Sequence, residues 1–194
     1  MINVNNKSLI FGCKNLVSIT IPDSVTNIED EAFARCKDLV SIIIPDSVVN
    51  IGRSAFLECS SLMSVTVGNG VKSIDDRVFS GCCSLTSIVI PDSVTSIGEH
   101  AFYGCSGLVN LTIGSSVTYI GLGAFKECIN LVSITIPGNV TYIDPFAFSG
   151  CSSLTSIHYT GTRAQWNAIQ KEEKWDKDAG PYIVHCVDGD IPKN

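Results

Sequence analysis

The sequence predicts a repeat solenoid, in which short parallel β-strands stack coil upon coil. Three observations predict this fold class: evenly spaced cysteines, apolar columns with the same spacing, and an alternating pattern inside each repeat. A fixed period of this kind is typical of repeat architectures, because one short unit cannot bury its apolar face without its neighbours. Seven of the nine cysteines recur at intervals of 23 residues: Cys13, Cys36, Cys59, Cys82, Cys105, Cys128 and Cys151.

Each repeat opens with a predicted strand. The segment Leu39–Ile44 shows the pattern Leu-x-x-Ile-x-Ile, whose period of two is typical of a strand with one buried face. A proline follows the strand in four repeats, and a glycine takes its place in two others. Because proline has no N–H group to donate, strand pairing is expected to end at this point.

The second half of each repeat reads Ile-x-x-x-Ala-Phe, as in Ile51–Phe56. This stretch is too short for a long helix. We therefore expect an extended segment followed by a short turn or 3-10 segment on the convex side, opposite the strands. The isoleucine and phenylalanine columns keep the same step as the cysteines, so they are the predicted core.

The N-terminus departs from the period. Residues 1–15 align with part of a repeat, with Ile2 in the column of Val25, and residues 16–162 contain the complete 23-residue repeats, which keep the period of the cysteines. No strand precedes Ile2. We expect either that the chain begins inside a longer protein, which we favour, or that a partner covers this end, because an uncapped solenoid exposes its core.

Residues 163–194 are predicted to cap the last coil. Trp166 falls in the column of Ile143 and lies in a short helical stretch. A charged loop over Lys171–Asp178 and a final strand over Tyr182–Val187 follow. A bulky apolar element with its charge facing outward suits a terminal cap. A ligand site built on the two tryptophans is the alternative.

Composition and charge exclude several classes of protein. The 194 residues are 45% hydrophobic and only 16% charged, which is too apolar for a disordered chain. The net charge of −6 argues against a nucleic-acid partner, which needs a basic surface. No apolar run approaches the roughly 20 residues of a membrane helix. Met1–Lys7 has no basic segment that leads into an apolar run, so no secretion signal is visible. The chain can therefore be mature, truncated or intracellular.

The cysteines have three interpretations: buried thiols, disulfides or a metal site. Parallel coils place equivalent cysteines side by side and pointing the same way, which does not suit the twisted geometry of a disulfide. No Cys-x-x-Cys pair is present, so we expect no metal site. We favour a ladder of buried thiols. Cys83 lies outside the register and is the expected accessible thiol.

The outward side of the strands is the candidate partner-binding surface. Residues between the core positions of a strand point away from the core, and here none of them is charged. A neutral platform for a protein segment or glycan is one interpretation, and simple strand propensity of β-branched and hydroxyl residues is the other. The candidate residues are Ser18, Thr20, Ser41, Ile43, Met63, Ser64, Thr66, Ser87, Val89, Asn110, Thr112, Ser133, Thr135, Ser156 and His158.

No catalytic motif accompanies these repeats. The sequence has no phosphate-binding glycine loop, no His-Glu-x-x-His helix and no Gly-x-Ser-x-Gly elbow. Acidic runs such as Glu29–Glu31 precede the Ala-Phe turn, where the start of a helical turn stabilises them. We therefore expect no enzyme, no catalytic residues, no metal and no cofactor.

The repeated run Leu-x-x-Ile-x-Ile-Pro-Asp-Ser-Val-x-x-Ile-x-x-x-Ala-Phe-x-x-Cys resembles the BspA-like, or treponemal-type, class of leucine-rich repeats over residues 8–162. The resemblance implies a right-handed coil with the strands on a concave face. Such proteins are typically surface or secreted proteins of host-associated microbes, implicated in adhesion to host proteins. We expect a binding scaffold from a cell-surface or secreted adhesin-like protein, with an extracellular host protein as partner. An intracellular interaction scaffold and a carbohydrate-binding module are the alternatives.

Overall fold

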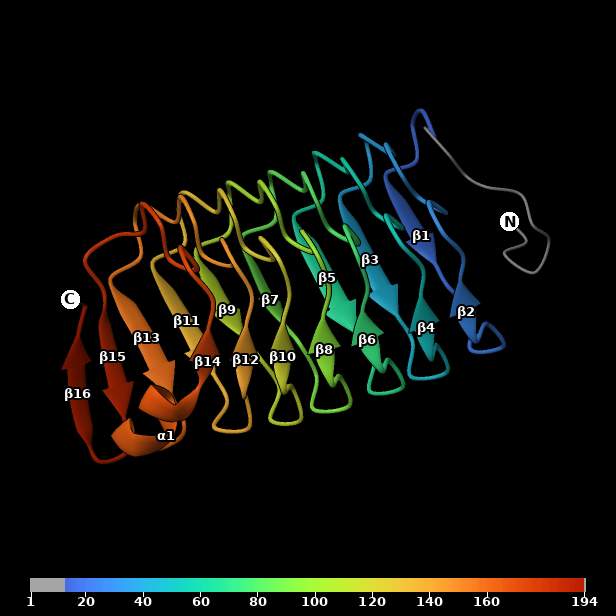
Figure 1. Cartoon of the computed structure of the whole chain (residues 1–194). Coiled ribbons are helices and arrows are strands. Elements are labelled where there is room, and N and C mark those ends of the chain that lie inside the picture. Colours follow the sequence, from blue (N-terminus) through green and yellow to red (C-terminus); the bar gives the residue numbers. More distant parts are fainter. Residues whose placement is uncertain (1–12, 194) are drawn as a thin grey trace.

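The computed structural model of the chain describes residues 13–193 and shows a parallel β-solenoid (Figure 1). One side, the strand side, consists of β1 (Ser18–Thr20), β3 (Ser41–Ile44), β5 (Ser64–Val67), β7 (Ser87–Val89), β9 (Asn110–Thr112), β11 (Ser133–Ile136) and β13 (Ser156–Tyr159). The opposite side consists of the two-residue strands β2 (Asn27–Ile28), β4 (Asn50–Ile51), β6 (Ser73–Ile74), β8 (Ser96–Ile97), β10 (Tyr119–Ile120) and β12 (Tyr142–Ile143).

Paired strands of neighbouring coils lie in parallel register, with an offset of one repeat. Ile42 lies beside Ile19 on one side and Val65 on the other. The predicted parallel solenoid is therefore confirmed, and its register is the one that the repeat columns indicate. The partial repeat expected at Ile2 lies outside the described residues.

Strand pairing is interrupted at one coil, the one that contains β5 and β6. On the strand side, β5 ends the sheet β1-β3-β5, and β7 begins the sheet that runs on to the C-terminus. On the opposite side, β4 ends the sheet β2-β4, and β6 begins the next one. We call the boundary between the facing edges of β5 and β7 the seam. Turns still join this coil to both neighbours, for example through the Phe56 N–H, which donates to the Val78 carbonyl at 2.9 Å.

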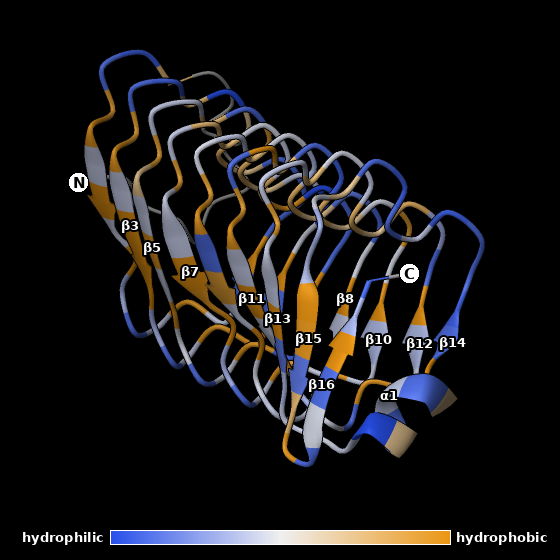
Figure 2. Ribbon diagram, turned by 90° about the vertical axis from the view of Figure 1, so that its left-hand side faces the viewer, coloured by the Kyte–Doolittle hydropathy of each residue, from blue (hydrophilic) through white to orange (hydrophobic). Residues whose placement is uncertain are grey.

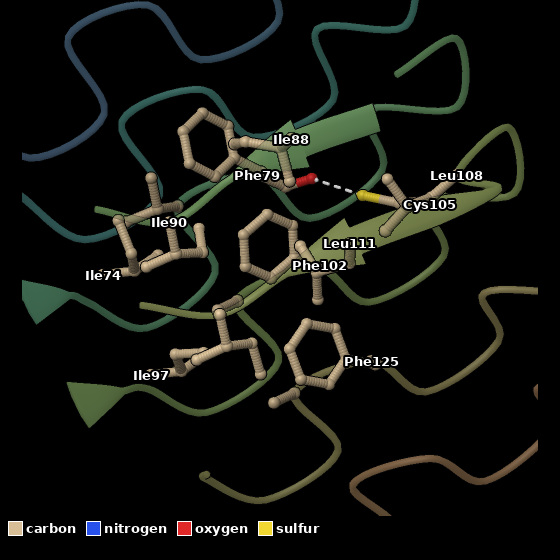
Figure 3. Packing of buried hydrophobic residues seen from close by; sticks show 14 of the residues in the cluster. Ile74, Phe79, Ile88, Ile90, Ile97, Phe102, Cys105, Leu108, Leu111 and Phe125 are labelled. Atoms are coloured by element: carbon tan, nitrogen blue, oxygen red, sulfur yellow. Dashed lines mark hydrogen bonds between the residues drawn. The ribbon is translucent and has the colours of Figure 1, made fainter. Parts of the chain in front are cut away.

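The core is built from aligned columns of identical or similar side chains. Consecutive phenylalanine rings stack with centroids 5.1–5.4 Å apart, and Figure 3 shows Phe79, Phe102 and Phe125 one above the next. The leucine and isoleucine columns beside them are almost entirely buried. An offset stack of aromatic rings is a favourable arrangement, so each coil offers the next a matching surface.

The turns on the opposite side contain two left-handed residues per repeat, four positions apart. One column comprises Glu31, Ser54, Arg77, His100, Gly123 and Phe146, and the other comprises Arg35, Glu58, Gly81, Gly104, Glu127 and Gly150. A right-handed helix does not continue through a left-handed residue. The described part of the chain accordingly has turns here and none of the 3-10 helix that was the other expectation.

The thiols form a ladder inside the core, as expected. No disulfide joins any of the nine cysteines, all of which lie in the described part of the chain. In five repeats the Sγ atom donates to the carbonyl oxygen of the phenylalanine 26 residues earlier, at 3.0–3.2 Å, and Figure 3 shows this bond for Cys105. Burial raises the pKa of Cys59 to about 12, and burial also raises the pKa of Cys82, Cys105 and Cys128.

Alkylation of the native protein is expected to distinguish Cys83 from the ladder. Cys83 is exposed, whereas Cys36 and the five hydrogen-bonded thiols are buried. Since the thiolate is the reactive form and needs access to the reagent, iodoacetamide at about pH 8 should modify Cys83 first. Mass spectrometry after timed quenching measures this order. The variant Cys83→Ser should lose the fast alkylation step. Rapid modification of Cys36 or of a hydrogen-bonded thiol in the folded protein would contradict the structure.

A C-terminal element follows the last full repeat. It comprises α1 (Arg163–Ala168), β14 (Gln170–Lys171), β15 (Ile183–Cys186) and β16 (Gly189–Pro192). Helix α1 begins at a capping box, in which the Thr162 hydroxyl accepts from the Gln165 N–H and the Gln165 side chain accepts from the Thr162 N–H. Strands β14 and β15 pair with β12 and β13, so each side of the solenoid gains one more rung.

Aromatic side chains of this element cover the end of the core. Trp166 packs on Tyr159 with centroids 5.2 Å apart, and Trp175 packs edge-on against Phe148 at 5.8 Å and Tyr182 at 6.1 Å. Trp166 and Tyr182 are buried. The two tryptophans therefore lie against the last coil, where a cap is expected, and a ligand site built on them stays an untested alternative.

Details of this element differ from the expectation. Lys171, and not Trp166, lies beside Ile143, because α1 places Trp166 on the end of the core and delays the next strand. Lys171 is also not in a solvated loop, since its Nζ donates to the Trp166 carbonyl oxygen at 2.5 Å. The expected final strand corresponds to β15, and antiparallel β16 has no counterpart among the predicted elements.

Candidate binding surface

The strand face is the outward side of β1, β3, β5, β7, β9, β11 and β13, together with Met63, which precedes β5. All fifteen candidate residues lie on this face, and all are exposed except Ser133, Thr135 and Ser156, which are half-buried. Figure 2 shows these strands mainly in white and orange, with much of the hydrophilic blue in the connecting turns. The alternation of the sequence thus predicts their orientation, and their role in binding stays a prediction.

The strand face combines hydroxyl groups with exposed aliphatic side chains. Ser18, Ser41 and Ser64 lie in one cross-strand column, which Asn110 interrupts beyond the seam. Between the hydroxyl groups, Ile43 is 65% exposed, Val89 64% and Met63 53%. No aspartate, glutamate, lysine or arginine lies among the fifteen residues. Such a surface suits a neutral partner that offers both apolar contacts and hydrogen bonds.

The C-terminal element extends the strand face with two residues that sequence reasoning did not include. Strand β15 places Ile183 beside Ser156 and His185 beside His158. The two imidazole rings stack with centroids 5.2 Å apart, and His185 Nδ1 lies 2.9 Å from an Asp190 carboxylate oxygen. The offset between these partners is longer than one repeat, so the period did not reveal this pairing. The alternation of Ile183, Val184 and His185 is the signal that could have found it.

A groove on the strand face brings part of the candidate set together. It has a volume of about 540 Å³ and is lined by residues from the coils of β5, β7 and β9, so it crosses the seam. Five candidates line it, and the other ten lie along the face on either side. The lining candidates are Ser64, Thr66, Ser87, Val89 and Thr112.

Charge enters this groove only at its rim. Among the described residues that line it, Asp92 is the one with an ionisable side chain. The neutral Asn69 lines the groove as well. The Ser115 N–H donates to the Asp92 carboxylate at 2.6 Å, and this bond lowers the pKa of Asp92. The groove therefore combines a neutral body with one carboxylate that is ionised at neutral pH.

Within residues 13–193, no group of three or more histidine, cysteine, aspartate or glutamate side chains is placed to hold a metal ion. The same residues include no helix whose length and apolar character would suit it to crossing a bilayer.

Comparison with a family model gives a match over most of the chain. The model described as "BspA type Leucine rich repeat region" matches in six copies, over residues 6–95 and 72–171. A comparison with curated proteins gives no significant match.

Solved structures give three informative similarities. A leucine-rich repeat protein of T. pallidum is 32% identical, with a TM-score of 0.71, over 73% of this chain and 68% of that chain. A leucine-rich cell surface protein of Faecalibacterium prausnitzii is 37% identical, with a TM-score of 0.60, over 81% of this chain but only 35% of its own length. A leucine-rich repeat protein of Bacteroides ovatus, 22% identical with a TM-score of 0.50 over 87% of this chain and 64% of that chain, shows the fold alone.

Proposed function

Because this chain belongs to the BspA-type leucine-rich repeat family, we propose that it is a non-catalytic binding scaffold of a cell-surface or secreted adhesin-like protein. Its strand face contacts an extracellular protein, such as a protein of the host. The observation that carries this proposal is the continuous uncharged surface over successive strands, on which large aliphatic side chains such as Ile43 and Val89 are left exposed. Exposed apolar patches on a folded protein mark interaction sites.

The surface location draws support from similarity. The similar protein of Faecalibacterium prausnitzii is described as a cell surface protein, and this chain spans about a third of it.

Two observations favour the alternatives. Thiols without disulfides in the repeats suit a reducing compartment and hence an intracellular scaffold, and the serine column suits a glycan that accepts and donates hydrogen bonds.

The proposal is tested with a panel of extracellular-matrix and plasma proteins beside a glycan array. We expect saturable binding to at least one protein of the panel. Introducing carboxylates on the strand face outside the groove, with Ser41→Glu and Thr135→Glu together, should weaken it by about tenfold or more, because the buried charges would have no partner. The matched control is Thr118→Glu, an exposed threonine next to β10 on the opposite side.

The outcomes separate the candidate functions. Binding that the control preserves and the double variant loses supports the strand face as the contact surface. Equal binding by both variants would contradict it. A signal on glycans alone would favour the carbohydrate-binding module.

A further inference from the structure

The coil that contains β5 differs from the other repeats at several neighbouring positions. Val65 and Val67 stand where the other repeats have isoleucine, leucine or tyrosine, so two core-facing positions of one strand carry the smallest side chain of their columns. Val67 is half-buried, whereas its counterpart Ile90 is fully buried. A glycine-rich turn, Gly68–Gly70, stands where three other repeats have Pro-Asp-Ser.

These departures coincide with the seam. The pairing of β5 with β7 is lost beside the strand whose side chains are reduced, and the groove lies at that point. The facing edges of β5 and β7 are not joined by strand pairing, and an unpaired strand edge favours the addition of an extended segment. Sequence irregularity, interrupted pairing and a groove therefore coincide at one place on the strand face.

The chemistry of the groove indicates its occupant. Its accessible aliphatic side chains are the exposed Val89 and the half-buried Val67, and hydroxyl groups of serine and threonine line it beside them. The described residues of its lining include no aromatic side chain on which a sugar ring could stack. At the rim, Asp92 is ionised, and Asp46 lies close by because its carboxylate accepts from the Asn69 N–H at 2.7 Å. A neutral body with an acidic rim complements an uncharged chain that carries one cation.

We propose that the groove at the seam binds an extended segment of the protein partner, with a branched aliphatic side chain against Val67 and Val89 and a neighbouring lysine or arginine directed at Asp92. This assignment rests on the proposed function and names the part of the partner that is recognised. The aliphatic side chain packs against the exposed Val89 and the half-buried Val67, and the peptide groups of the segment meet the hydroxyl groups of the lining.

The probe for this assignment is a random dodecapeptide library displayed on phage and selected on the immobilised chain. We expect enriched peptides to pair a basic residue with valine, isoleucine or leucine. Synthetic copies of these peptides are then titrated against two variants at exposed threonines, Thr66→Trp in the groove and Thr118→Trp next to β10 on the opposite side. Blocking the groove should weaken binding by about tenfold or more, whereas Thr118→Trp should leave the affinity unchanged.

Two further variants test the fit and the charge. Val65→Ile with Val67→Ile restores the core-facing side chains that other repeats carry, so it should fold, favour strand pairing at the seam and weaken peptide binding. Asp92→Asn keeps an acceptor for the Ser115 N–H and should weaken binding about threefold at low salt, an effect that should vanish at about 0.5 M salt. Asp23→Asn, in the same column of the turns but away from the groove, is its control.

Several results would overturn the assignment. These are a failure to enrich peptides, enriched peptides without a basic residue, and equal affinities for Thr66→Trp and Thr118→Trp. If peptides fail while a panel protein binds and the Ser41→Glu, Thr135→Glu variant loses it, the proposed function stands and the groove assignment is wrong.

Discussion

Replacing Phe102 by alanine is expected to lower the free energy of unfolding by about 3–5 kcal/mol. Phe102 is fully buried, and its ring stacks between Phe79 and Phe125 at centroid distances of 5.4 Å on both sides. The cavity left behind would be bounded by rings from two adjacent coils, each held by its own stack, so it has little freedom to collapse. Because a solenoid is stabilised by contacts between neighbouring repeats, one substitution here weakens two interfaces.

Urea unfolding followed by circular dichroism measures this loss. The matched control is Tyr103→Ala in the same turn, since Tyr103 is also aromatic but 39% exposed. We expect the control to change stability by less than about 1 kcal/mol. Similar losses for both variants would contradict the view that the phenylalanine column holds the coils together.

Much of the fold follows from the sequence because each coil packs against equivalent residues of the next. A column such as the one containing Ile42 and Val65 therefore also predicts which residues of neighbouring strands lie side by side. The turns carry no comparable signal. Their left-handed positions hold Glu31, Arg35 and His100 as well as glycine, so composition does not reveal them. The C-terminal element does not follow the repeat period, since the insertion of α1 changes the offset between partner strands.

The sequence predicts which candidate side chains face outward, but it does not predict the groove on the strand face. Alternation along a strand decides which side chains face outward, and that rule places Thr66 and Thr112 on the strand face. The groove between them lies where strand pairing is interrupted, beside Val65 and Val67. A change from isoleucine to valine looks conservative in a repeat column, so the column by itself did not predict an interruption there.

Raising the pH above about 9 is expected to destabilise the protein steeply. Burial raises the pKa of Cys59, Cys82, Cys105 and Cys128, so these thiols stay protonated in the folded state. In the unfolded chain they ionise near the usual value of about 8.5. The folded state then binds more protons than the unfolded state, and its stability falls as pH rises. Their contribution is complete below pH 8.5 or so and is lost progressively towards the raised pKa, about 12 for Cys59.

Each thiol that ionises only on unfolding contributes a slope of roughly 1 kcal/mol per pH unit. Four together give a decline of several kcal/mol between about pH 9 and pH 11. Urea midpoints measured across this range check the slope. The variant Cys105→Ala removes one titrating group, so its stability should decline less steeply than that of the wild type, whatever its cost at neutral pH.

The exposed Cys83, replaced by alanine, is the control for this slope. It should leave the slope unchanged, because Cys83 is already exposed in the folded state and does not belong to the buried ladder. Identical slopes for wild type and Cys105→Ala would show that the ladder thiols do not carry the effect. The tyrosines whose pKa is raised, such as Tyr182 through burial and its bond to Asp176, would then be the groups responsible.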